Sequence, residues 1–119
     1  MDRSRTLLSL DIDGTLESGD PPGPVTIDVV RLALERGVIV GSASDRTVSF
    51  QRKMWEAVGV TVHFIGHKHH LADLIRPFEC VRRVHIGDTD ADRHYAKLAG
   101  LEFCHVDQLP AVGAAGWIL

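Results

Sequence analysis

The feature that most constrains the fold is a repeated alternation between short apolar runs and segments with helically spaced apolar residues. The apolar runs are continuous rather than mixed with polar residues, which is typical of strands buried on both faces. Strands are predicted at 6–10, 38–42, 60–65, 84–87 and 101–106. Strand-then-helix alternation with short connections predicts a parallel sheet covered on both sides.

The helices predicted between these runs have recognisable start and stop signals. Thr26 can cap the first helix, and Gly37 ends it. The second helix begins at Ser44, Asp45 or Thr47 and ends at Gly59. The third and fourth helices are predicted over 68–78 and 90–99. The expected fold is therefore α/β, a three-layer α/β/α Rossmann-like arrangement around a sheet of about five strands.

Length and composition restrict the class further. The chain has 119 residues, which predicts a single domain over 1–119. Thirteen basic residues against 16 acidic ones give a net charge of −3, so charge does not support a nucleic-acid partner. We expect no membrane segment, because no run approaches the ~20 apolar residues required. Cys80 and Cys104 form no CxxC pair, which favours a reduced, cytoplasmic protein.

Polar residues gather where the first four predicted strands end. These residues are Asp11 and Asp13, Ser42 and Ser44, Lys68, and Asp88 with Asp92. Ligands of open α/β sheets bind outside the carboxyl ends of the strands, so these segments can converge on one site. Crowded carboxylates repel one another unless a cation lies among them, and Mg²⁺ prefers carboxylate, water and phosphate oxygens. A lysine and a hydroxyl suit the remaining phosphate oxygens. The set therefore predicts Mg²⁺ beside a phosphoryl group.

Two motifs carry a resemblance to a known family. Residues 11–15 match DxDGT and residues 87–92 match GDxxxD, with Ser42 and Lys68 after the second and third predicted strands. This pattern resembles the haloacid dehalogenase superfamily of phosphohydrolases over residues 6–106. The resemblance implies a Mg²⁺-dependent phosphatase that hydrolyses a phosphomonoester through an aspartyl phosphate.

The resemblance also implies a role for each matching residue. Asp11 would be the nucleophile, and Asp13 the general acid and then the general base. Asp11, the backbone carbonyl of Asp13, and Asp88 would hold the metal, and Asp92 would act on metal-bound water or on Lys68. Ser42 would bind phosphoryl oxygens, and Lys68 would offset negative charge.

Some assignments stay open. Ser44 competes with Ser42 as the phosphate-binding hydroxyl, and Arg46 contacts substrate or is a solvated helix residue. His67, His69 and His70 surround Lys68, but three histidines so close cannot all face one metal on a regular helix. We therefore interpret them as surface residues, of which His67 or His69 could touch substrate. His63 and His85 lie in predicted strands and are expected to be hydrogen-bonded structural residues.

The spacing between the motifs leaves no room for a cap domain. Residues 16–25 are a loop with three prolines, and residues 42–68 hold one helix and one strand. A capless member has an open site, so we expect a phosphorylated substrate that is small or macromolecular, including a nucleotide or polynucleotide. A homo-oligomer could supply the lid.

The alternative is a receiver-like or catalytically idle module that binds a phosphoryl group. A receiver places its phosphoacceptor after the third strand, where this chain has no carboxylate.

Overall fold

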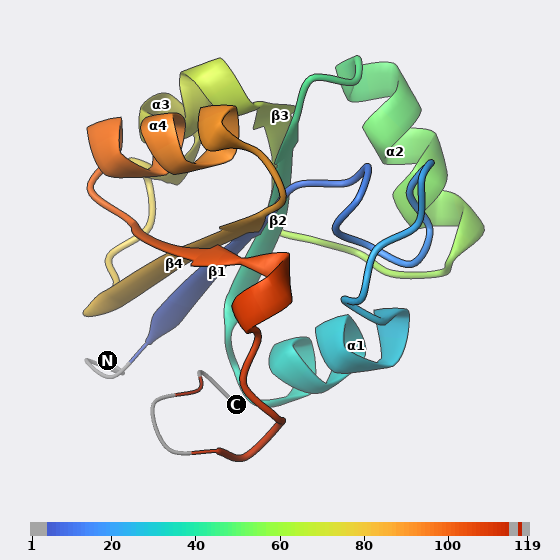
Figure 1. Cartoon of the computed structure of the whole chain (residues 1–119), viewed down its shortest axis with the longest axis horizontal. Helices are drawn as coiled ribbons and strands as arrows, with labels where there is room; N and C mark the ends of the chain where they lie inside the picture. The colour runs from blue at the N-terminus through green and yellow to red at the C-terminus, as the bar shows by residue number, and fades with distance from the viewer. Residues whose placement is uncertain (1–4, 115–116, 118–119) are drawn as a thin grey trace.

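The computed structural model describes residues 5–114 and 117, and it shows one parallel sheet in the strand order β3-β2-β1-β4-β5 (Figure 1). The strands are β1 (Thr6–Leu10), β2 (Ile39–Ser44), β3 (Phe64–His67), β4 (Arg82–Gly87) and β5 (Glu102–His105). The predicted five-stranded α/β architecture is confirmed. The direction of strand addition reverses between β1 and β4, and such reversal points are where α/β sheets bind ligands.

Two helices cover each face of the sheet (Figure 1). The helices α1 (Ile27–Glu35) and α2 (Val48–Ala57) pack on one face, where Trp55 and Val30 join a core with Leu8 and Leu10. The helices α3 (Leu71–Ile75) and α4 (Asp90–Leu98) cover the other face. Successive side chains of each strand point to opposite layers, so continuous apolar runs are buried on both faces.

Four strands have boundaries that differ from the prediction. β2 covers 39–44 rather than 38–42, and β3 covers 64–67 rather than 60–65. β4 begins at 82 rather than at 84, and β5 covers 102–105 rather than 101–106. Just before β3, the Nδ1 atom of His63 accepts the Val40 N–H at 3.1 Å, and regular pairing with β2 begins one residue later, with Gly41 opposite Phe64.

The predicted third helix over 68–78 is wrong in length and type. A 3₁₀ turn, η1 (Lys68–His70), comes first, and α3 then has only five residues. Pro77 accounts for the early end, because it has no N–H to continue the backbone ladder. The turn at η1 changes where the neighbouring side chains point, which matters for the site.

Residues 14–25 form a folded loop between β1 and α1. A bridge pairs Leu16 with Val25, and the Gly14 N–H donates to the Pro21 carbonyl at 2.6 Å. Gly14 has φ +75°, a conformation that side chains disfavour, and a Cβ there would overlap the Asp88 carboxylate. The loop therefore lies against the end of β4.

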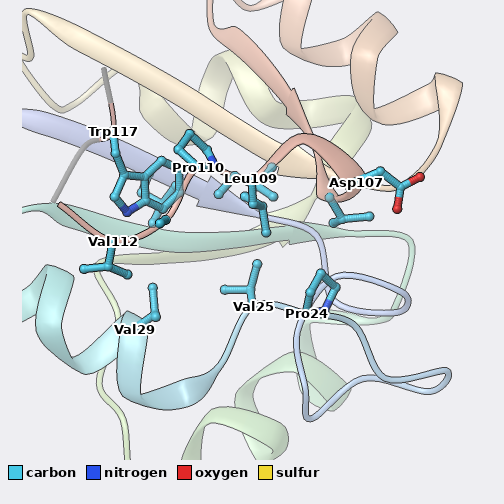
Figure 2. Close-up of a pocket in the computed structure, with 12 residues that line it drawn as sticks. Pro24, Val25, Val29, Asp107, Leu109, Pro110, Val112 and Trp117 are labelled. Carbon is cyan, nitrogen blue, oxygen red and sulfur yellow. The ribbon is translucent and has the colours of Figure 1, made fainter. Parts of the chain in front are cut away.

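After β5, the turn η2 (Val106–Gln108) leads into a segment that folds back over the α1 side of the sheet. Figure 2 shows Leu109, Pro110 and Trp117 opposite Val25 and Val29 across an apolar pocket of about 380 Å³. This pocket lies on the face opposite α3 and α4. Within 5–114 and 117, no helix has the length and apolar character needed to cross a membrane.

Candidate active site

The carboxylates after β1 and β4 meet at the reversal point of the sheet. Asp11 continues the backbone ladder by donating its N–H to the Ile86 carbonyl at 3.0 Å, and Asp88 directly follows β4. Asp11, Asp88 and Asp92 each offer an oxygen, and these oxygens lie within 4.8 Å of one another. The adjacency of β1 and β4 therefore brings together residues more than 70 positions apart in the chain.

Lys68 is buried among carboxylates rather than exposed. Its side chain is 3% exposed, and Nζ lies 3.3 Å from an oxygen of Asp11 and 3.0 Å from one of Asp92. A third carboxylate, that of Asp45, lies 3.7 Å from Nζ. Burial alone would lower the pKa of Lys68, but Asp11 and Asp92 outweigh it and raise that pKa. Lys68 is therefore a fixed positive charge beside Asp11.

Asp92 is fully buried, and both of its oxygens are occupied. One oxygen contacts Lys68 and lies 2.8 Å from Nε2 of His85. The other accepts from the N–H and the hydroxyl of Thr89, which forms a capping box at the start of α4. Burial would raise the pKa of Asp92, but the hydrogen bonds from His85 and Thr89 and the charge of Lys68 lower it. These contacts suit Asp92 to orienting Lys68 more than to binding a metal directly.

His85 links this network to the neighbouring strand. Its Nδ1 atom lies 2.8 Å from the Ser9 hydroxyl, and the ring is fully buried. His63 makes the hydrogen bond to Val40 described above. Both histidines are hydrogen-bonded, as predicted, but His63 is exposed and lies just before β3 rather than within it.

Asp11 and Asp88 are neighbouring carboxyl groups whose surroundings do not fully stabilise their charged forms. Burial, followed by the negative charge of Asp92, raises the pKa of Asp11 to about 8, although Lys68 opposes the shift. Asp88 Oδ1 is buried without a hydrogen-bond partner among the described residues. A buried carboxylate oxygen without a donor is costly, and a cation is the group that satisfies it. The residues present therefore fit a divalent cation held by Asp11 and Asp88.

Asp13 is not among the three carboxylates of this cluster. β1 ends at Leu10, the Asp11 N–H still pairs with β4, and the chain turns at Asp13. Ile12 between the two carboxylates is buried in the core. Asp13 accepts from the Asp20 N–H at 2.9 Å and pairs with Arg46 Nε at 2.7 Å.

These contacts set the charge state of Asp13. Partial burial would raise its pKa, but the hydrogen bonds from Arg46 and the Asp20 N–H outweigh that effect and lower it. Asp13 is therefore held ionised at the mouth of the site by Arg46.

The two serines of β2 have different surroundings. The Ser42 hydroxyl is fully buried, donating to Gln51 Oε1 at 2.7 Å and accepting from Trp55 Nε1 at 3.0 Å. Ser44 lies at the carboxyl end of β2, opposite His67, and its oxygen accepts only the Arg46 N–H at 3.1 Å among the described contacts. Both serines are buried: Ser42 lies in the core under α2, and Ser44 lies at the carboxyl end of β2 with 2% of its surface exposed. The cap of α2 is Thr47, which accepts from the Phe50 N–H.

Gln51 is a residue that the sequence reasoning missed. It is fully buried, and its amide donates to the carbonyls of Arg46 and Gly66 at 2.9 Å, which ties the ends of β2 and β3 together. A signal was present, because Gln51 precedes Met54 and Trp55 by three and four positions and so shares their buried helix face.

Comparisons with protein-family models, with curated proteins and with solved structures found no match for this chain.

Proposed function

We propose that this protein is a Mg²⁺-dependent phosphatase that hydrolyses a phosphomonoester through an aspartyl phosphate on Asp11, as in the haloacid dehalogenase superfamily. The observation that carries the proposal is the pairing of Asp11 and Asp88 within 4.8 Å, with the orphaned Asp88 oxygen and buried Lys68 beside them. Mg²⁺, when bound, would neutralise charge between the carboxylates and the phosphoryl group.

The first chemical step is assigned to Asp11. A carboxylate oxygen of Asp11 attacks phosphorus, and the bond from phosphorus to the leaving oxygen breaks while Asp13 gives that oxygen a proton. Lys68 stays within 3.3 Å of Asp11 and stabilises the charge that develops on the transferred group. Asp92 holds Lys68 in place.

The second step releases phosphate. A water molecule attacks phosphorus, Asp13 takes its proton, and the bond to Asp11 breaks, which regenerates the free carboxylate. In the free protein Arg46 keeps Asp13 ionised, which is the state of a base. The first step needs a protonated Asp13, so Arg46 is assigned to leave Asp13 for the phosphoryl oxygens when substrate binds.

The sheet order argues against the receiver alternative. Receivers have the order 2-1-3-4-5, whereas this sheet has the order 3-2-1-4-5 and places its acidic cluster after β1 and β4. A catalytically idle module has no support in the site, because the residues assigned to chemistry are all present.

Substrate class and assembly remain predictions. The loop of residues 14–25 is short, which suits an open site and a small or macromolecular phosphorylated substrate. We also propose that a homo-oligomer supplies a lid for the site. We further propose a cytoplasmic location, where Cys80 and Cys104 stay reduced.

The decisive variant is Asp11→Asn, which keeps the shape of the side chain and removes the attacking charge. We expect hydrolysis of p-nitrophenyl phosphate and of a panel of phosphorylated metabolites and oligonucleotides to fall at least about a thousandfold. Chelation by EDTA should abolish wild-type turnover, and Mg²⁺ should restore it.

The matched control is Asp28→Asn on the exposed face of α1, which should retain full activity. Acid quenching of the wild type with labelled substrate should trap a phosphoryl group on the chain that hydroxylamine releases, and Asp11→Asn should trap none. Turnover that survives in Asp11→Asn would falsify the assignment of Asp11 as nucleophile. Turnover that is unaffected by EDTA would contradict the dependence on Mg²⁺.

A further inference from the structure

Three histidine rings gather on the outer side of the turn that carries Lys68. The rings of His67 and His69 are stacked with centroids 5.3 Å apart, and those of His69 and His70 lie 4.1 Å apart. One ring nitrogen from each of the three lies within 4.8 Å of the others. His69 and His70 are exposed. Lys68, which lies between His67 and His69 in the chain, points inward and is 3% exposed.

The local backbone explains this gathering. The prediction that these histidines cannot share a metal assumed a regular α-helix from 68 onward, and that assumption is wrong. His67 ends β3, and η1 is a 3₁₀ turn with about three residues per turn. Positions three apart are eclipsed in such a turn, so His70 returns to the side of His67 while Lys68 faces the interior.

The chemistry of this group differs from that of the acidic cluster. Imidazole nitrogens suit Zn²⁺ and its transition-metal neighbours, whereas carboxylates suit Mg²⁺. Tetrahedral Zn²⁺ with nitrogens ~2.1 Å away needs nitrogens about 3.4 Å apart. The exposed rings of His69 and His70 can close that gap by side-chain rotation, because no hydrogen bond to either ring is present among the described residues.

We propose that His67, His69 and His70 form a binding site for a transition-metal dication of the Zn²⁺ class, separate from the carboxylate site. Three protein ligands leave the fourth tetrahedral position for water or an anionic ligand. The site shares its turn with Lys68, whose Nζ lies 3.3 Å from Asp11. Metal binding by these three histidines does not depend on whether Asp11 is a nucleophile.

The test is a calorimetric titration of the untagged full-length chain with Zn²⁺ in excess Mg²⁺, which occupies the carboxylate site. We expect one Zn²⁺ per chain, with an affinity reduced more than about tenfold in His69→Gln and abolished in His69→Gln with His70→Gln. His94→Gln is the matched control, because His94 is exposed nearby on α4 but lies outside the group. It should bind Zn²⁺ as the wild type does.

A second measurement locates the metal. Co²⁺ in place of Zn²⁺ should give the visible absorption of a tetrahedral nitrogen site in the wild type and in Asp88→Asn, and none in the double histidine variant. Unchanged thermal unfolding of the metal-free variants establishes that they fold. Zn²⁺ binding that is absent in the wild type, that persists in the double variant, or that is lost in Asp88→Asn would overturn the proposal.

Discussion

At the residue scale, the two serines of β2 differ in whether the hydroxyl is free to bind the phosphoryl group of the proposed function. Ser42 donates to Gln51 and accepts from Trp55, so recruiting it would leave both partners unpaired in a dry interior. Ser44 accepts one backbone N–H and retains its own hydrogen for a ligand. We therefore assign the hydroxyl of the proposed site to Ser44, two residues beyond the serine that the motif resemblance favours.

The two serines give opposite expectations when each is changed to alanine. Ser44→Ala should lower kcat/KM about 10- to 100-fold, because it removes a donor to the developing charge, and should cost less stability than Ser42→Ala, because it leaves only the Arg46 N–H without its acceptor. Ser42→Ala should lower the free energy of unfolding by about 1–3 kcal/mol, since it leaves Trp55 Nε1 and Gln51 Oε1 unpaired, with a smaller effect on kcat/KM. Steady-state kinetics and urea unfolding of both variants make the comparison. The assignment is wrong if Ser42→Ala loses activity while its stability is unchanged.

At the scale of elements, the start of α4 joins folding to the site. Thr89 caps the helix and also donates to Asp92, which in turn contacts Lys68. The helix α1 has a simpler cap, in which Thr26 accepts the Val29 N–H and touches no site residue. The cap of α4 is therefore connected to the site through Asp92, whereas the cap of α1 is not.

Thr89→Ala should lower the free energy of unfolding by about 2–3 kcal/mol, because it removes the cap and also a hydrogen bond of a buried carboxylate. It should also lower kcat, since Asp92 loses part of its orientation. Thr26→Ala is the control and should cost about 1 kcal/mol with unchanged kcat. Urea unfolding and phosphatase assays of Thr89→Ala and Thr26→Ala measure both effects. Equal losses of stability and unchanged kcat in both variants would contradict the role given to Asp92.

At the scale of the whole molecule, the proposed site would make a divalent cation compete with a proton for the buried Asp11 carboxylate. The pKa of Asp11 is raised from 3.8 to about 8 in the folded chain without metal. Between these values the folded state binds the extra proton, so this group makes the metal-free chain less stable as pH rises from about 4 to about 8. If the proposed cation binds there, it displaces that proton and removes this loss of stability.

The stabilisation by Mg²⁺ should therefore grow with pH. We expect the Mg²⁺ affinity to rise about tenfold per pH unit up to about pH 8 and then to level off, because one proton leaves for each ion bound. Thermal unfolding with and without Mg²⁺ at several pH values between 6 and 9 measures this. In Asp11→Asn, which has no such proton, the change in melting temperature caused by Mg²⁺ should not depend on pH. If that change is also independent of pH in the wild type, Asp11 is not a ligand of the metal.

The architecture and the position of the site could be predicted from the sequence because they depend on patterns that are short and local. Continuous apolar runs require two-sided burial, and parallel strands must end at one edge, so Asp11 and Asp88 were expected there before any strand order was known. The partners of Asp13, in contrast, were not predicted, because Arg46 and the Asp20 N–H reach it from other segments of the chain.

What only the tertiary structure decided is the partner of each polar side chain. Ser42 meets Trp55 and Gln51, and Asp92 meets His85 and Lys68, through contacts between different elements. The gathering of His67, His69 and His70 likewise depends on a 3₁₀ turn in place of the predicted helix. The physical reason is the same throughout. Periodicity determines which face of an element is buried, whereas a hydrogen bond depends on atoms brought together from distant parts of the chain.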